Sequence, residues 1–174
     1  LWDTYRALHP LFNIVQPSRN RDMIKSMMAH YNQSVHKMLP IWSHYANENW
    51  CMIGYHSVAL IADAMVKGVI EKNPEYLNAC VNTANNKNYD GIPFYKELGY
   101  VPEDKNSSSV SKTLEYAYDD WTIAQIASML SDKDTELEFL KRSENYKNVF
   151  DKNINFMRPK FSDGSWKKDF NTLS

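Results

Sequence analysis

The sequence predicts an all-α fold built from antiparallel helix hairpins. Apolar residues recur with helical spacing in five segments: 18–32, 54–67, 74–84, 109–130 and 134–150. The alternation of apolar and polar residues that is typical of strands is absent over any useful length. We therefore expect no sheet of more than two strands.

Local signals support these helices in chain order. Pro17 and Ser18 favour a helix start before the first segment, and Gly68 can end the second. Pro74 suits the first turn of the third helix. The stretch 85–109 is polar and carries Gly and Pro, so we expect mostly loop there, with one short turn of helix around Phe94.

Two of the apolar helices share a weak internal echo. Ile61-Ala-Asp-Ala64 and Ile123-Ala-Gln-Ile126 occupy corresponding places, and a Tyr with polar neighbours precedes each. Helix hairpins in a toroid produce this layout, and so does an array of helical repeats. In the toroid, the amino ends of the helices that begin near Gly54 and Ser109 point to one concave surface.

Composition excludes several classes of protein. The 174 residues suit one domain, and the net charge of −1 gives no reason to expect nucleic acid as a partner. No apolar run is long enough for a spanning helix, so we expect no membrane partner. Cys51 and Cys80 lack metal-site spacing, which disfavours zinc, and two buried free thiols are favoured over a disulfide.

The strongest candidate site lies in the segment from Ser109 to Trp121. On a helix, Glu115 and Asp119 share one face, and Asp120 lies on the adjacent face with Tyr116. Carboxylates beside aromatic rings suit a sugar, because rings cover its C–H face and carboxylates accept from its hydroxyls. The alternative is an ordinary helix capped by Ser109 or Ser111, with its acids in solvent.

Two further clusters repeat this mixture of aromatic and polar residues. One contains Trp42, Glu48 and His56, although a hydrogen-bonded structural role for His56 is an equal alternative. The other, at the amino end, contains Asp3 and Arg6, which are three residues apart and able to pair on one helical turn. The alternative for that pair is a surface salt bridge of little energetic value.

Motifs along almost the whole chain resemble the catalytic domain of family 92 glycoside hydrolases, the calcium-dependent exo-acting α-mannosidases. These motifs are Trp2-Asp-Thr-Tyr-Arg6, Leu39-Pro-Ile-Trp42, Asn47-Glu48, Cys51-Met-Ile-Gly-Tyr-His56, Gly99-Tyr-Val-Pro102, the segment from Ser109 to Trp121, and Phe156-Met-Arg-Pro159. The chain departs from the family pattern at Ala46, where the family has Gly, and at Asn49-Trp50, where it has Thr-Asn.

The resemblance implies an (α/α)6 toroid preceded by a β-sandwich domain. Residues 1–174 would then be about half of the toroid, truncated at both ends. It also implies removal of terminal α-linked mannose, with α-1,2 linkages expected, from mannose-containing glycans such as N-glycans, by inversion. It further implies calcium in the intact enzyme, with no ligand assignable in this chain, and a periplasmic or secreted location.

The resemblance places the catalytic acid and base beyond Ser174. The chain would then supply substrate-binding residues, need the remainder of its own polypeptide as partner, and be inactive when isolated. We expect Asp3 or Glu48 to hold sugar hydroxyls or support the calcium shell without transferring protons. The full candidate set is Asp3, Arg6, Trp42, Glu48, His56, Glu115, Asp119 and Asp120.

Two other functions are compatible with the residues. An (α/α)6 glycosidase acting on a different sugar would use Glu115 or Asp119 directly. A non-enzymatic helical interaction module would bury the aromatic clusters as ordinary core.

Overall fold

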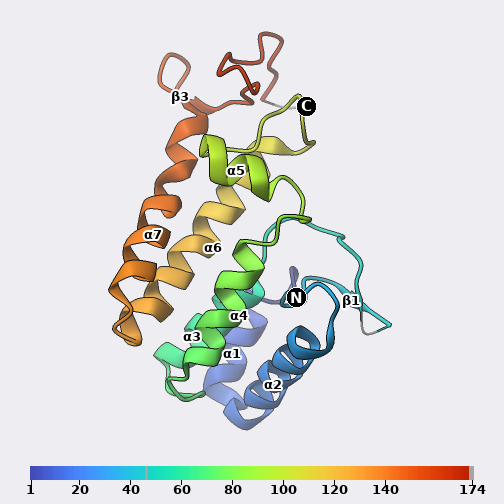
Figure 1. Cartoon of the computed structure of the whole chain (residues 1–174), viewed down its shortest axis with the longest axis vertical. Coiled ribbons are helices and arrows are strands. Elements are labelled where there is room, and N and C mark those ends of the chain that lie inside the picture. The colour runs from blue at the N-terminus through green and yellow to red at the C-terminus, as the bar shows by residue number, and fades with distance from the viewer. Residues whose placement is uncertain (46, 173–174) are drawn as a thin grey trace.

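The computed structural model describes residues 1–45 and 47–172, so Ala46 lies outside the described residues. Helix α6 (Ser109–Met129) is the longest element and packs against α7 (Lys133–Ser143), α3 (Ser57–Val66) and α4 (Pro74–Ala84). Figure 1 shows α6 and α7 side by side, with α1, α2, α3 and α4 gathered toward the lower end of α6 and α5 at its upper end. The all-α prediction is confirmed.

The predicted helices appear close to their expected bounds. Segment 18–32 forms α2 (Pro17–Gln33), and segment 54–67 forms α3, which starts three residues later than expected. Segment 134–150 is only partly an α-helix, because α7 ends at Ser143 and a 3-10 helix, η1 (Glu144–Val149), continues it. The turn expected around Phe94 is a longer helix, α5 (Ile92–Leu98).

Helix α1 (Leu8–Val15) was not predicted, because its polar residues face inward. His9 and Asn13 are its buried residues, and both bond to the Asn20 side chain of α2. Asn13 also donates to Asp63 of α3. The apolar residues lie on the opposite side, exposed by 41% to 72%: Leu8, Leu11, Ile14 and Val15. Apolar spacing therefore does not identify this helix, because its buried face is polar.

Strands are short throughout the described residues. β1 (Ser43–His44) pairs antiparallel with β2 (Asn47–Glu48), and β3 (Phe150–Asp151) pairs antiparallel with β4 (Phe156–Met157). Each sheet has two strands, as expected. In the β1–β2 hairpin, Glu48 pairs with Ser43.

The core forms where α3 and α6 meet. Eight of the ten residues of α3 are buried, because this helix is apolar nearly all round. α6 faces it with small side chains such as Ala124 and Ala127, which allow close approach of the two helices. Removing this apolar surface from water stabilises the pair by roughly 25 cal/mol per Å².

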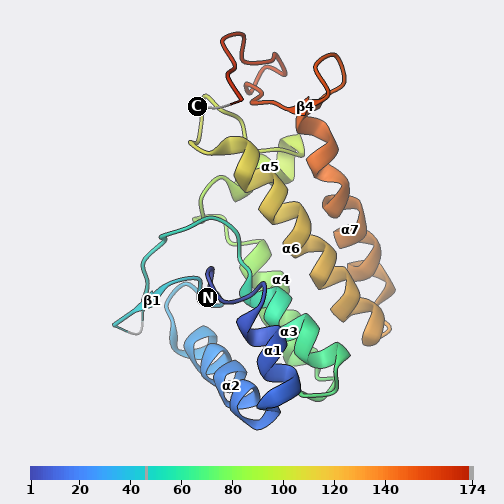
Figure 2. The same ribbon diagram turned by 180° about the vertical axis from the view of Figure 1, so that it is seen from behind.

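The amino-terminal segment lies between the β1 hairpin and α6 in both views (Figures 1 and 2). Residues 2–7 form turns, not the helical turn expected for an Asp3–Arg6 pair. The Leu1 ammonium donates to the Ile41 carbonyl, and the Leu1 carbonyl accepts from the Tyr5 N–H. The first bond ties the segment to the residues just before β1, and the second fixes its own turn.

Two remaining expectations concern cysteines and membranes. Both cysteines are free, but only Cys80 is buried, so the expectation that Cys51 is also buried is wrong. Cys51 lies in the irregular segment before α3, and its side chain is exposed. Among the described helices, none has the length and apolar character needed to cross a bilayer.

Candidate functional site

A cluster of polar side chains forms where the amino-terminal segment meets α3 and α6. His56 directly precedes α3, Glu115 and Asp119 lie on the facing side of α6, and Tyr5 comes from the amino-terminal segment. The helical spacing of Glu115 and Asp119 puts both carboxylates in reach of one imidazole, as their shared face predicted.

The His56 ring lies between the two carboxylates. Its Nδ1 is 2.8 Å from Asp119 Oδ1, a hydrogen-bond distance. Its Nε2 is 3.1 Å from Glu115 Oε2, an ion-pair distance, although the N–H is not aligned on that oxygen. Tyr5 stacks on the ring face with 3.9 Å between centroids. The imidazole is 1% exposed and is therefore held on three sides by protein.

The electrostatics of the cluster favour a charged imidazole. Burial by itself would lower the pKa of His56, but the Asp119 and Glu115 carboxylates outweigh it and raise the pKa to about 9. Burial would raise the pKa of Glu115, yet His56, Arg6 and the Tyr5 hydroxyl hold it below its usual value. Burial raises the pKa of Asp119 against the opposing effects of His56 and the Tyr55 N–H.

Glu115 connects this buried cluster to solvent. Its side chain is 18% exposed, and its Oε1 lies 3.3 Å from Nη2 of Arg6, whose side chain is 67% exposed. The predicted Asp3–Arg6 pair is therefore replaced by an Arg6–Glu115 pair. Tyr118 and Trp121 of α6 are about half exposed along the same helix. A carboxylate, a guanidinium and exposed rings are the groups that bind a polyhydroxylated ligand.

Glu48 binds backbone N–H groups and not the side chains around His56. Its carboxylate accepts from the N–H groups of Ile41, Trp42, Asn49 and Trp50 at 2.5 to 3.2 Å. It is 8% exposed, so these donors replace water around the charge. Glu48 thus fixes the loop that carries Trp42, and its contact with sugar or calcium stays a prediction.

Asp120 points away from His56, into the contact between α6 and α7. It accepts from the hydroxyls of Tyr55 and Tyr95 and from Nε of Arg142, and it is fully buried. Burial raises the pKa of Asp120 to about 6, although Arg142 and the two hydroxyls oppose the rise. The structure therefore gives Asp120 a place in the core, apart from the other predicted site residues. The alternative of solvated acids on this helix is wrong for both Asp119 and Asp120.

Asp3 and Trp42 remain near the surface. Asp3 is exposed, and Trp42 is half-buried. The buried indole N–H groups of Trp42 and Trp2 find no hydrogen-bond partner among residues 1–45 and 47–172. Within the described residues, no group of three or more His, Cys, Asp or Glu side chains is placed to hold a metal ion.

The sequence predicted that the amino ends of α3 and α6 point to one surface, and only the end of α3 does so. The amino end of α3 reaches the cluster, but it faces Glu115 and Asp119, which lie about two and three turns inside α6. The first residue of α6, Ser109, instead donates its hydroxyl to Glu103. It does not cap the helix, and Ser108, in the left-handed region, takes the N-cap position.

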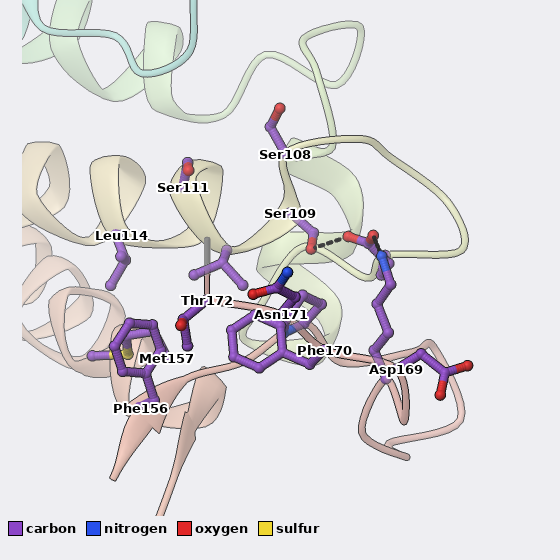
Figure 3. Close-up of a pocket in the computed structure, with 14 residues that line it drawn as sticks. Ser108, Ser109, Ser111, Leu114, Phe156, Met157, Asp169, Phe170, Asn171 and Thr172 are labelled. Carbon is purple, nitrogen blue, oxygen red and sulfur yellow. Dashed lines mark hydrogen bonds and ion pairs between the residues drawn. The ribbon is translucent and has the colours of Figure 1, made fainter. Parts of the chain in front are cut away.

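Ser109 lines a separate pocket of about 600 Å³ between the start of α6 and the carboxyl-terminal segment. In Figure 3 Leu114 of α6 points toward Phe156 and Met157, whereas Ser111 points away from them, and dashed lines join Ser109 to Glu103 and Glu103 to a lysine, Lys167. The described lining of this pocket contains none of the eight predicted site residues.

Sequence reasoning missed Tyr5 and Gly54. Tyr5 is 5% exposed and supplies both the stacked ring and a 3.3 Å hydrogen bond to Glu115. Gly54 has φ +80°, and a Cβ there would lie 2.5 Å from His56 Nε2. A glycine two residues before a histidine at a helix start is a usable signal, but the stacking of Tyr5 depends on a distant part of the chain.

Comparison with known proteins agrees with the sequence resemblance. The whole chain, residues 1–174, matches the glycosyl hydrolase family 92 catalytic domain. It is similar to the GH92 α-mannosidase BT3965 from Bacteroides thetaiotaomicron, with 52% identity and a TM-score of 0.96, over 100% of this chain and 24% of that one. A structure of BT3965 in complex with mannoimidazole matches with 53% identity and a TM-score of 0.94, over 98% of this chain and 23% of that one.

A more distant relative gives the same result. The inverting mannosidase BT2199 of family GH92, from Bacteroides thetaiotaomicron VPI-5482, matches with 34% identity and a TM-score of 0.90, over 98% of this chain and 24% of that one. A comparison with curated proteins gives no match. The chain thus spans about a quarter of the length of the solved structures it matches. The helical pairs described above correspond to part of an (α/α)6 catalytic domain, and the chain belongs to glycosyl hydrolase family 92.

Proposed function

We propose that this chain contributes part of the sugar-binding site of an enzyme that removes terminal α-linked mannose with inversion, with α-1,2 linkages as its substrate. The observation that carries the proposal is Glu115: a carboxylate held in place by buried groups, yet partly open to solvent beside Arg6. Its family membership and its similarity to named α-mannosidases support mannose as the sugar.

Each group has a role in binding. Glu115 accepts a hydrogen bond from a sugar hydroxyl, and Arg6 donates one from the same side. The exposed ring of Tyr118 covers an apolar face of the sugar. Asp3 binds a further hydroxyl without transferring a proton, because inverting hydrolysis needs an acid and a base about 6.5–9.5 Å apart that the resemblance assigns outside this chain.

Calcium belongs to the same proposal. By the family resemblance, most ligands of the proposed ion belong to other parts of the polypeptide. Removal of calcium by a chelator should abolish mannoside turnover by the polypeptide that contains this chain, and added calcium should restore it.

The direct test is hydrolysis by the polypeptide that contains this chain. Aryl α-mannoside should be cleaved and aryl α-glucoside should not, and proton NMR should show β-mannose as the first product. The mannobioses with α-1,2, α-1,3 and α-1,6 linkages then test the linkage. Cleavage of the glucoside alone favours the glycosidase for another sugar, and no hydrolysis of any glycoside favours the interaction module.

Substitution at Asp3 tests its assigned role. Asp3→Asn should weaken mannoside turnover by about 10- to 100-fold, since a hydrogen bond to a charged group contributes roughly 1.5–3 kcal/mol. Both limbs of the pH–rate curve should survive. If one limb disappears and azide or formate restores the rate, Asp3 transfers a proton and the assignment is wrong.

A further inference from the structure

His56 has a charged partner at each ring nitrogen, which a buried neutral histidine does not require. Both ring nitrogens face carboxylates, Asp119 at 2.8 Å and Glu115 at 3.1 Å. A second buried histidine, His9, bonds instead to the neutral amide of Asn20. One end of the His56 arrangement, Asp119, is fully buried, and the other, Glu115, reaches solvent.

We propose that His56 is a positioning residue: as an imidazolium backed by Asp119, it holds Glu115 ionised and in one orientation as an acceptor for a substrate hydroxyl. The inference rests on the proposed function, since it assigns Glu115 to the sugar site. His56 itself touches no substrate. It acts only through Glu115.

The backbone around the ring is built for this placement. A side chain at Gly54 would overlap the imidazole, with a Cβ 2.5 Å from Nε2 and 2.6 Å from Cε1. The Tyr5 ring closes the opposite side at an interplanar angle of 15°. The ring therefore occupies space that only a glycine at position 54 leaves free, with Nε2 directed toward Glu115.

The charges facing His56 come from two elements. α6 supplies Asp119, Glu115 and the more distant Tyr118 ring, and the amino-terminal segment supplies Tyr5. Arg6 faces Glu115 from the solvent side. Two carboxylates are thus balanced by an imidazolium and a guanidinium. Asp119 also accepts from the Tyr55 N–H at 2.7 Å, which fixes its carboxylate behind the ring.

The carboxylate that results is suited to binding. A buried ion pair without further bonds is costly, but here each charged group has several partners. Glu115 interacts with His56, Tyr5 and Arg6, so little orientational freedom is lost when a ligand binds. Its pKa is held low, so it remains an acceptor under mildly acidic conditions.

The first experiment measures protonation of His56 in the polypeptide that contains this chain. Ring ¹⁵N shifts of the wild type should show both nitrogens protonated at pH 7.5. Glu115→Gln should lower the pKa of His56 while leaving His9 unchanged. A neutral His56 in the wild type, or a His56 titration that Glu115→Gln does not move, overturns the proposal whether or not the protein acts on mannosides.

The second experiment separates positioning from stability. His56→Gln should raise KM for an aryl α-mannoside about 10-fold, while kcat changes little, because binding strength is lost in ground and transition states alike. The acid limb of 1/KM should move to higher pH, since Glu115 regains a more ordinary pKa. His9→Gln, a substitution at another buried histidine, should change neither KM nor the acid limb of 1/KM.

A double substitution completes the test. In a Glu115→Gln background, His56→Gln should raise KM less than about 2-fold, because the two residues act as one unit. Full additivity overturns the inference. Absence of mannoside turnover in the wild type overturns the proposed function instead, and the NMR measurement then still decides whether His56 holds Glu115.

Discussion

The rings of Tyr5 and His56 stack with 3.9 Å between their centroids, although one belongs to the amino-terminal segment and the other to the start of α3. This contact brings the Glu115 carboxylate within 3.3 Å of the Tyr5 hydroxyl and within 3.1 Å of the His56 Nε2. Gly54, on the same turn as His56, leaves the space that the ring fills.

Gly54→Ala should therefore destabilise the chain more than its backbone conformation alone requires. A left-handed φ costs an alanine about 1–2 kcal/mol, and displacing the imidazole adds to this. Gly68→Ala is the matched control, because Gly68 has φ +69° with nothing within 4 Å of a Cβ. Urea unfolding of both variants measures the difference. Equal losses of stability mean that the His56 ring moves aside without cost.

Stability should depend on pH through His56. The pKa of His56 in the fold, about 9, lies above its unfolded value near 6.5, so the imidazolium stabilises the fold fully below pH 6.5. This contribution, on the order of 3 kcal/mol, should be lost as the pH rises through 9. Urea unfolding of the wild type and of His56→Gln between pH 6 and 10 should show that their free energies of unfolding converge as the pH rises.

His9→Gln provides a control of opposite sign. Burial lowers the pKa of His9, despite the opposing bond to Asn20, so its neutral form is favoured in the fold. Its contribution is therefore gained, not lost, as the pH rises toward its unfolded value near 6.5, and it is complete above that pH. Convergence in the same direction for both variants contradicts the assignment of charge to His56.

Glu48→Gln should loosen the β1–β2 hairpin. An amide offers one acceptor oxygen and turns N–H donors toward backbone N–H groups that the carboxylate now satisfies. We expect a loss of about 2–3 kcal/mol in the free energy of unfolding and faster amide exchange at Ile41 and Trp42. Glu97→Gln, at an exposed position of α5, should change neither quantity.

Arg142→Met should destabilise the contact between α6 and α7 by about 3–5 kcal/mol at pH 7, because it leaves the Asp120 charge buried without its partner. Burial already raises the pKa of Asp120 to about 6, and loss of Arg142 removes an opposing effect. A raised pKa stabilises the fold at low pH and this stabilisation is lost as the pH rises. Lowering the pH to 5 should therefore reduce the difference in the free energy of unfolding between Arg142→Met and the wild type.

Adding Asp120→Asn to Arg142→Met checks the cause of that loss. With the carboxylate removed, the loss of stability caused by Arg142→Met, measured by thermal unfolding against Asp120→Asn alone, should no longer depend on pH between 5 and 7. If the pH dependence persists, another titrating group is responsible.

The sequence by itself determined the helical class, the approximate bounds of α2, α3, α4 and α6, and the family. Apolar spacing carries this information because a helix places residues three and four apart on one face. The same rule correctly put Glu115 beside Asp119. It failed for α1, whose inward face is polar because it bonds to Asn20 and Asp63.

Only the tertiary structure decided which partner each polar residue has. Arg6 pairs with Glu115 and not with Asp3, and Asp119 and Asp120, adjacent in sequence, face His56 and Arg142. Adjacent helical residues point about 100° apart, so packing of α6 between α3 and α7 sends them to different neighbours. Local spacing fixes the direction of a side chain relative to its own helix, whereas the neighbour it meets depends on contacts between residues far apart in the chain.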